Sequence, residues 1–212
     1  MPADFQGKVA LVTGVGRVGQ IGHAVARGLG RAGAKLLLAD VNAVGLADRV
    51  KEFAAEGIAA KASAGDLTRP EAGRQAVAVA QAQFGGIDVV VNVAGGFFSF
   101  GPFTEVTPET LDKELAVNFK TAFFTCQAAV PALLTRGRGS IVNFASIAAV
   151  RSGTAPSPWR SMRRTAYCPQ RRKSAQPVQS WAIFSGIQMC GTMVKPRRTK
   201  CDGSCVKALS VE

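Results

Sequence analysis

The sequence has few cysteines, no long hydrophobic run and no secretory leader. Of its 212 residues five are cysteine, and only Cys126 precedes residue 150, so the first two thirds lack the disulfide framework of exported domains. No uninterrupted apolar run approaches the ~18 residues that cross a bilayer, and residues 1–4 do not begin a charged and then apolar leader. These absences predict a cytoplasmic protein with no membrane segment and no membrane partner.

Acidic residues are scarce in only one part of the chain. Residues 1–150 contain 14 Lys and Arg against 12 Asp and Glu, whereas residues 151–212 contain 12 against 2. The formal net charge of +12 therefore belongs mostly to the last third, which also holds both tryptophans, the one tyrosine and four cysteines. This change of composition predicts one folded domain over residues 1–150 and a basic, poorly ordered tail over residues 151–212.

Short β-branched and leucine-rich runs alternate with alanine-rich segments of helical period. The expected strands are residues 8–13, 35–40, 58–63, 87–92 and 140–145, and the expected helices are residues 21–32, 43–56, 70–84 and 108–135. The strands are apolar nearly throughout, as in parallel sheets covered on both faces. The order predicts an α/β fold with a doubly wound parallel sheet between two helical layers. Gly33 is expected to stop the first helix, and Thr68 and Thr107 to cap the last two.

A glycine-rich segment, TGVGRVGQIG, joins the first expected strand to the first expected helix at residues 13–22. Glycines permit positive φ and a close backbone approach, and the free N–H groups of a helix N-terminus attract a pyrophosphate. Such a segment alone can also be an ordinary tight turn. Its position between a strand and a helix favours a phosphate site.

This segment resembles the T-G-x-x-x-G-x-G turn of the short-chain dehydrogenase/reductase family, with a loop about two residues longer than the usual form. Residues 87–96, IDVVVNVAGG, resemble the family's N-N-A-G signature, with Val93 in the second place. The resemblance covers residues 8–149, which are similar to the 3-oxoacyl-reductase and glucose-dehydrogenase-like members of the family. It implies a Rossmann-type, three-layer domain that uses NAD or NADP to transfer hydride between nicotinamide and a small alcohol or ketone.

The same resemblance implies a cofactor site. Gly14 and Gly22 match the family turn directly, and Gly16 and Gly19 match it approximately. Asp40 would accept the ribose hydroxyls of the adenosine half, which favours NAD over NADP, although it could instead cap the next helix. The implied cofactor-binding residues are Thr13, Gly14, Gly16, Gly19, Ile21, Gly22, Asp40, Asp66, Leu67, Asn92, Ala94 and Gly95.

Some of these assignments have plainer alternatives. Arg17 could meet the 2'-phosphate of NADP, which argues against NAD. Asp66 and Leu67 resemble the family's pair that contacts the adenine ring, but Asp66 could be a simple loop carboxylate. Asn92 could serve only to brace the sheet.

The family's catalytic set is only partly present. Ser146 follows the fifth expected strand, where the family has its catalytic serine, but it could be a plain turn serine. Asn118 matches the family's active-site asparagine, but it could be a core amide whose hydrogen bonds are satisfied. At the spacing of the family's Tyr-x-x-x-Lys pair the chain has Trp159 and Arg163, and indole cannot transfer the substrate proton. Tyr167 is the only tyrosine, and we treat it as a catalytic candidate.

The last third does not resemble the family's sixth and seventh strands. A change of reading frame near Pro156 would explain this loss, and the coding DNA would test that hypothesis. In that case the edge formed by Ile141 and Val142 would be unpaired, and the helix used in the family's homo-oligomers would be missing.

Three functions follow as hypotheses. The first is an NAD-dependent oxidoreductase, the second a catalytically impaired nucleotide-binding fragment of such an enzyme, and the third a nucleic-acid binder that uses the basic tail. We favour the first and expect no nucleic-acid partner. We also expect no metal site, because Cys201 and Cys205, even with Cys190, lack a fourth ligand for zinc.

Overall fold

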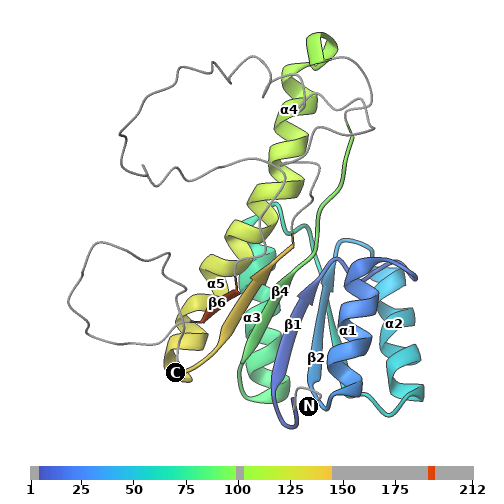
Figure 1. Ribbon diagram of the computed structural model, residues 1–212, viewed down its shortest axis with the longest axis vertical. Coiled ribbons are helices and arrows are strands. Elements are labelled where there is room, and N and C mark those ends of the chain that lie inside the picture. Colours follow the sequence, from blue (N-terminus) through green and yellow to red (C-terminus); the bar gives the residue numbers. More distant parts are fainter. Residues whose placement is uncertain (1–4, 99–102, 145–190, 194–212) are drawn as a thin grey trace, which may run out of the picture.

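A twisted sheet forms the centre of the protein (Figure 1). The computed structural model describes residues 5–98, 103–144 and 191–193. The strands lie in the order β3-β2-β1-β4-β5-β6, and the first five are parallel. The strands are β1 (Val9–Thr13), β2 (Lys35–Asp40), β3 (Ala60–Ala64), β4 (Val89–Asn92), β5 (Ser140–Asn143) and β6 (Gly191–Met193).

Helices connect the parallel strands. They are α1 (Ile21–Arg31), α2 (Ala43–Ala55), α3 (Pro70–Phe84), α4 (Pro108–Leu115) and α5 (Thr121–Thr135). A π-helix, Ala116–Lys120, joins α4 to α5, and a 3-10 turn, Phe103–Glu105, precedes α4. The single helix expected over residues 108–135 is therefore continuous but contains a π-helical section.

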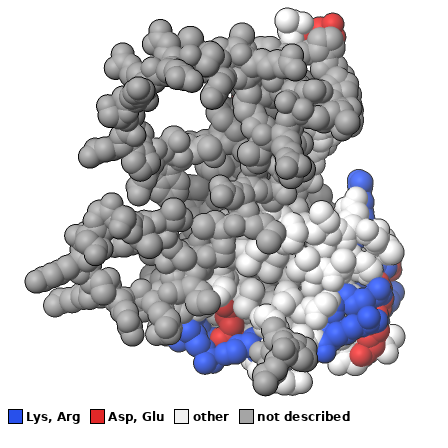
Figure 2. All heavy atoms as spheres, in the orientation of Figure 1, with Lys and Arg blue, Asp and Glu red and all other residues white. Residues whose placement is uncertain are grey.

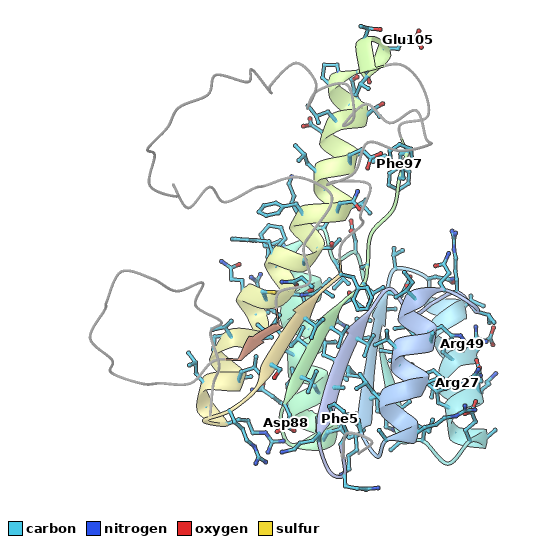
Figure 3. All side chains as sticks on the ribbon, viewed as in Figure 1. Phe5, Arg27, Arg49, Asp88, Phe97 and Glu105 are labelled. Carbon is cyan, nitrogen blue, oxygen red and sulfur yellow. The ribbon has the colours of Figure 1, made fainter. Side chains whose placement is uncertain are left out.

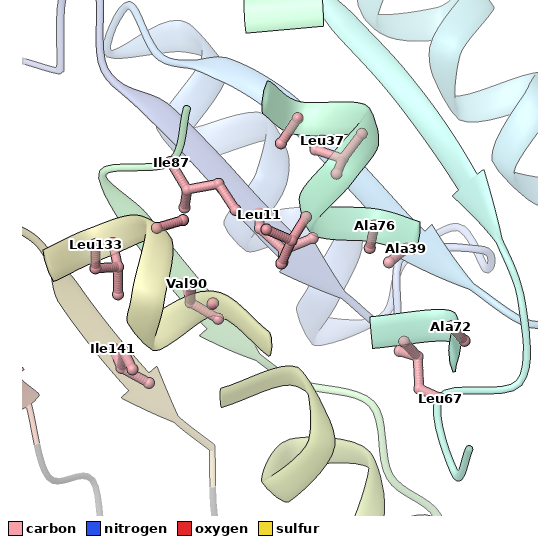
Figure 4. Close-up of a cluster of buried hydrophobic side chains, with 14 residues drawn as sticks. Leu11, Leu37, Ala39, Leu67, Ala72, Ala76, Ile87, Val90, Leu133 and Ile141 are labelled. Atoms are coloured by element: carbon pink, nitrogen blue, oxygen red, sulfur yellow. The ribbon is translucent and has the colours of Figure 1, made fainter. Parts of the chain in front are cut away.

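Two apolar cores cover the two faces of the sheet. Leu11 and Leu37 point toward α3 and α5, in the cluster that Figure 4 shows. Their chain neighbours Val12 and Leu38 point the other way and pack with Phe53 of α2. Each buried leucine contributes about 1.5–3 kcal/mol to folding. Because helices cover both faces of the sheet, the side chains on both faces are buried, and this explains why the strands are apolar nearly throughout.

Local signals explain the starts of α3 and α4. Thr107 caps α4, since its side chain accepts a hydrogen bond from the Thr110 N–H. The expected cap by Thr68 is wrong: Arg69 occupies the N-cap position of α3 without a side-chain cap, and the Thr68 hydroxyl donates to Asp66 instead. Pro70 in the first turn of α3 explains how this helix can start without a cap.

The expectation of an unpaired β5 edge is also wrong. β6 pairs antiparallel with β5, and Ile141 and Val142 lie opposite Thr192 and Gly191. Residues 181–190, which could have formed a strand by their composition, lie outside the described residues, and β6 follows them directly. Among the helices that the structure describes, none has both the length and the apolar character needed to span a bilayer.

Candidate functional site

The carboxyl ends of β1, β2, β4 and β5 lie together at one end of the sheet (Figure 1). From β1 the chain crosses to β2 on one side, and β4 lies on the other side of β1. Doubly wound sheets bind ligands at this kind of switch point. The glycine-rich turn, defined here as residues 14–20, and the segment 93–96 flank it.

The glycine-rich turn fits tightly against its neighbours. Gly14 has φ +74°, and a Cβ atom there would lie 2.8 Å from the backbone nitrogen of Ala94. A Cβ atom at Gly22, in the first turn of α1, would overlap the carbonyl oxygen of Gly14. Glycine at both positions therefore allows the first turn of α1 to pack against the backbone that follows β1.

No side chain of the described residues caps the N-terminus of α1. Gln20 is its N-cap and makes no side-chain cap hydrogen bond, and no acidic residue lies in its first turn. The first N–H groups of a helix carry partial positive charge. The arrangement fits a phosphate or pyrophosphate group.

Thr13 ties the end of β1 to the chain after β4. Its side chain is buried, and its hydroxyl oxygen accepts hydrogen bonds from the N–H groups of Val93 and Ala94, each at 3.0 Å. This contact holds the backbone of the N-N-A-G-like segment beside the glycine-rich turn.

Asp40 lies between that turn and α2. One carboxylate oxygen accepts from the Gly16 N–H at 2.8 Å, and the other accepts from the Asn42 N–H at 2.9 Å. Asp40 is not the cap of α2, because Asn42 caps it by accepting from the Gly45 N–H. A carboxylate oxygen can accept more than one hydrogen bond, so the fixed Asp40 retains capacity for further donors.

Asp66 and Leu67 serve local structure. One Asp66 oxygen accepts from both the hydroxyl and the N–H of Thr68, at 2.7 and 3.0 Å. The hydroxyl hydrogen bond is the main reason why the pKa of Asp66 is lowered, with further help from Arg69. Leu67 is buried in the core beside Ala72 (Figure 4), so its side chain is committed to packing.

Asn92 braces the interior. It is 4% exposed, and its amide nitrogen lies 2.8 Å from the Asn143 side-chain oxygen and 3.2 Å from the Cys126 sulfur. It thereby links β4 to β5 and α5. Burial raises the pKa of the Cys126 thiol, which keeps this thiol protonated.

Asn118 lies in the π-helix and holds the segment after β4. Its side-chain oxygen accepts from the Gly96 N–H at 3.0 Å, and its amide nitrogen donates to the Gly96 carbonyl at 2.7 Å. The same nitrogen lies 2.9 Å from the carboxylate of Glu114, which in turn accepts from the Phe98 N–H. Figure 3 shows Phe97 in this segment beside the helix. A π-helical section is frequent at functional sites.

Two buried polar residues of this region were not predicted from the sequence. Glu114, 1% exposed, supports Asn118, and His23, 4% exposed, lies beneath the glycine-rich turn. Glu114 lies in the polar sequence PETLDKEL of α4, so its position one helical turn before Asn118 was the available signal. Ser146, Trp159, Arg163 and Tyr167 lie outside the described residues.

Charged side chains near α1 and α2 form mixed clusters. Arg27 and Arg49 both pair with Glu52, and Arg27 and Arg31 pair with Glu56. Figure 2 shows blue and red atoms together on this face, and Figure 3 shows Arg27 and Arg49 on adjacent helices. Paired charges of both signs stabilise the packing of α1 on α2.

Comparisons with known proteins agree with this geometry. A family model described as short chain dehydrogenase matches residues 8–160, which is beyond the residue 149 where the resemblance was expected to end. The L-rhamnose-1-dehydrogenase of Scheffersomyces stipitis is 36% identical over 191 residues, which cover 88% of this chain and 70% of that protein.

Other relatives match over a smaller share of their own length. An uncharacterized oxidoreductase of Staphylococcus aureus strain USA300 is 36% identical over 140 residues, which are 66% of this chain and 58% of that protein. The solved structure of a short-chain type dehydrogenase/reductase from Mycobacterium ulcerans superposes with a TM-score of 0.69 and 30% identity, covering 77% of this chain and 60% of that chain. This chain therefore spans about three fifths of these two proteins.

Proposed function

Because this chain belongs to the short-chain dehydrogenase family, we propose that it binds NAD and transfers hydride between the nicotinamide and an alcohol or ketone of a small molecule. The observation that carries the proposal is the tight junction of Gly14 and Gly22 at the switch point of the sheet, with Asp40 fixed beside it. When bound, NAD would supply the ring that accepts or gives the hydride.

The pyrophosphate of the dinucleotide would lie against the glycine-rich turn. The uncapped first turn of α1 offers N–H groups and partial positive charge there. The close approach that Gly22 permits would bring these groups near the end of β1. Gly16 and Gly19 would allow the longer turn to pass around the phosphates.

The adenosine ribose would be bound by Asp40. Its carboxylate is held by two backbone N–H groups and can still accept hydroxyl hydrogens. A 2'-phosphate at this place would meet a like charge, so we propose a preference for NAD over NADP. Arg17, in the turn, is the feature that favours NADP instead.

The nicotinamide half would lie near the segment 93–96. Thr13 and Asn118 fix the backbone of this segment from two sides. By resemblance to the family, Ser146 would donate a hydrogen bond to the substrate oxygen as charge develops on it. Tyr167 is the candidate to exchange the substrate proton, since Trp159 stands where the family has its tyrosine.

A nucleotide-binding chain with impaired catalysis is the second candidate. It is favoured by one observation: Trp159 and Arg163 occupy the spacing of the family's Tyr-x-x-x-Lys pair. Arginine holds its proton far more strongly than lysine and binds through a rigid planar fork, so it replaces lysine poorly.

Calorimetry and an activity assay separate the two candidates. The full-length chain is titrated with NAD⁺ and with NADP⁺, and NADH formation is then followed with secondary alcohols and L-rhamnose. Binding together with turnover supports the oxidoreductase, and binding without turnover on any of these alcohols supports the impaired chain. Turnover that is lost in Ser146→Ala and in Tyr167→Phe would support both catalytic assignments, whereas turnover retained in Tyr167→Phe would contradict the role of Tyr167.

A further inference from the structure

The single histidine of the chain links the glycine-rich turn to α2. The ring of His23 is buried and stacks on Phe53, with 5.8 Å between ring centroids and 9° between ring planes. Its Nδ1 atom lies 3.2 Å from the backbone nitrogen of Gly19, and its Nε2 atom lies 2.9 Å from a carboxylate oxygen of Glu52. Both ring nitrogens are therefore engaged, one by the turn and one by the helix.

The partners of the ring determine its tautomer. Glu52 is ionised, because the hydrogen bond from His23 and the guanidinium groups of Arg49 and Arg27 lower its pKa by more than its burial raises it. An ionised carboxylate only accepts, so Nε2 must carry a hydrogen, whereas the Gly19 N–H only donates, so Nδ1 must be bare. Only the neutral ring with its hydrogen on Nε2 satisfies both contacts.

Gly19 lies in an exposed part of the turn. It has φ +76°, and among the described residues no atom apart from its chain neighbours lies within 4 Å of the position that a Cβ atom would take. The hydrogen bond to His23 therefore holds the backbone at a position where no described neighbour packs against a Cβ. The turn is also about two residues longer than the family pattern, and this length makes an anchor more necessary.

We propose that neutral His23 is a positioning residue: it anchors Gly19, holds the glycine-rich turn in the shape that receives the pyrophosphate, and releases the turn when the ring takes up a second proton. The proposal rests on the proposed function, since it assigns the turn to a dinucleotide. It makes dinucleotide affinity depend on pH through one identified side chain.

The chemistry of protonation sets the direction of the effect. A hydrogen on Nδ1 would face the Gly19 N–H, so two donors would oppose each other and the anchor would be lost. The charged groups around the ring are Glu52 and Arg49 from α2 and Arg27 from α1, with Glu56 and Arg31 beyond them. Glu52 still pairs with the imidazolium, so the fold is retained while the turn is released.

Nuclear magnetic resonance tests the anchor without any dinucleotide. Because His23 is the only histidine, the ring nitrogen signals of the full chain report one residue and identify its tautomer. We expect the neutral ring to carry its hydrogen on Nε2, and the Gly19 amide, with hydrogen exchange corrected for the intrinsic effect of pH, to become less protected as the ring is protonated. A neutral ring with its hydrogen on Nδ1, or a Gly19 amide whose protection does not change when the ring is protonated, would overturn the proposal.

Two substitutions separate positioning from packing. His23→Asn keeps a side-chain oxygen near the position of Nδ1 but loses the ring, whereas His23→Phe keeps a ring on Phe53 but loses the acceptor. By calorimetry with NAD⁺ near pH 7.5, we expect His23→Asn to bind within about threefold of the wild type and His23→Phe about tenfold more weakly, the range of one hydrogen bond. Thermal unfolding checks that each variant is folded.

The pH dependence completes the test. As the pH is lowered until the ring nitrogen signals show a doubly protonated His23, we expect the wild type to lose about tenfold in NAD⁺ affinity, and both variants to change much less over the same pH range. Tighter binding by His23→Phe than by His23→Asn, or a wild-type pH profile that both variants share, would contradict the proposal. Absence of NAD⁺ binding at every pH would count against the proposed function, while the ring tautomer and the Gly19 amide would still decide whether the anchor exists.

Discussion

In the proposed function, Asp40 is the residue that would select the dinucleotide. In the substitution Asp40→Ala the ribose would lose a charged acceptor, and the Gly16 N–H would lose its partner at 2.8 Å. Hydrogen bonds to charged groups contribute about 1.5–3 kcal/mol, so we expect NAD⁺ affinity to fall by roughly 10- to 100-fold. The preference over NADP⁺ should become smaller, and calorimetry with both dinucleotides measures the two effects.

Asp48 provides the matched control for this prediction. It is an exposed carboxylate on α2, so Asp48→Ala removes the same charge without touching the glycine-rich turn. We expect NAD⁺ affinity to stay within about twofold of the wild type, because exposed charges contribute little. An equal loss in both variants would mean that only net charge matters and that Asp40 does not bind the ribose.

Gly22 is the residue whose small size the site most requires. In Gly22→Ala the new methyl group would overlap the Gly14 carbonyl oxygen, and backbone atoms on both sides cannot move far. We expect NAD⁺ binding to be lost and the melting temperature to fall. Gly28→Ala is the control, because it lies in the same helix with nothing within 4 Å of the new Cβ atom; it should keep binding and gain up to about 1 kcal/mol. Normal binding by Gly22→Ala would refute the proposed close approach.

At the scale of elements, α1 and α2 are joined by an ion-pair network centred on Glu52. Its pKa is lowered in the folded protein, mainly because His23 and two arginines outweigh the effect of burial. A carboxylate with a lowered folded pKa contributes stability above its unfolded pKa, and loses it as pH falls through the folded value. The network should therefore weaken below about pH 4.3, the ordinary glutamate value.

The variant Glu52→Gln tests this pH dependence. We expect it to be less stable than the wild type near pH 7 and to show a smaller further loss in acid, as measured by urea unfolding at several pH values. Glu71→Gln serves as the control, since the Glu71–Arg74 pair is largely exposed and such pairs contribute little. Parallel pH curves for the wild type and Glu52→Gln would contradict the assignment.

The elements also show what local patterns can predict. The bounds of β2 and α3 agree with the expected ranges, because the apolar runs there coincide with the hydrogen-bonded segments. β3 and β4 each begin two residues later than expected. Ile58 and Ile87 are buried but precede the strands, so an apolar residue signals burial rather than strand pairing.

Long-range contacts set the limit for the rest. The pairing of β5 with β6 joins segments about fifty residues apart, and no local sequence pattern predicts it. In the site, the resemblance of residues 13–22 to the family turn indicated Gly14 and Gly22, and the position of Asp40 at the end of an expected strand indicated a carboxylate near them. The hydrogen bonds of Asp40 with Gly16, and of His23 with Gly19, depend on how the turn folds back, which the residue types alone do not determine.

At the scale of the whole molecule, the end of the sheet where the parallel strands have their carboxyl ends should bind the dinucleotide, and the opposite end should not. The amide signals of the full-length chain, followed as NAD⁺ is added, test this most directly. We predict that the signals of Gly14, Gly16, Gly19 and Gly22 move with the dinucleotide concentration, while those of Gly57 and Gly85, which follow α2 and α3 at the opposite end, stay in place. Turn signals that do not move at saturating NAD⁺, or signals that move only at the opposite end, would contradict the account.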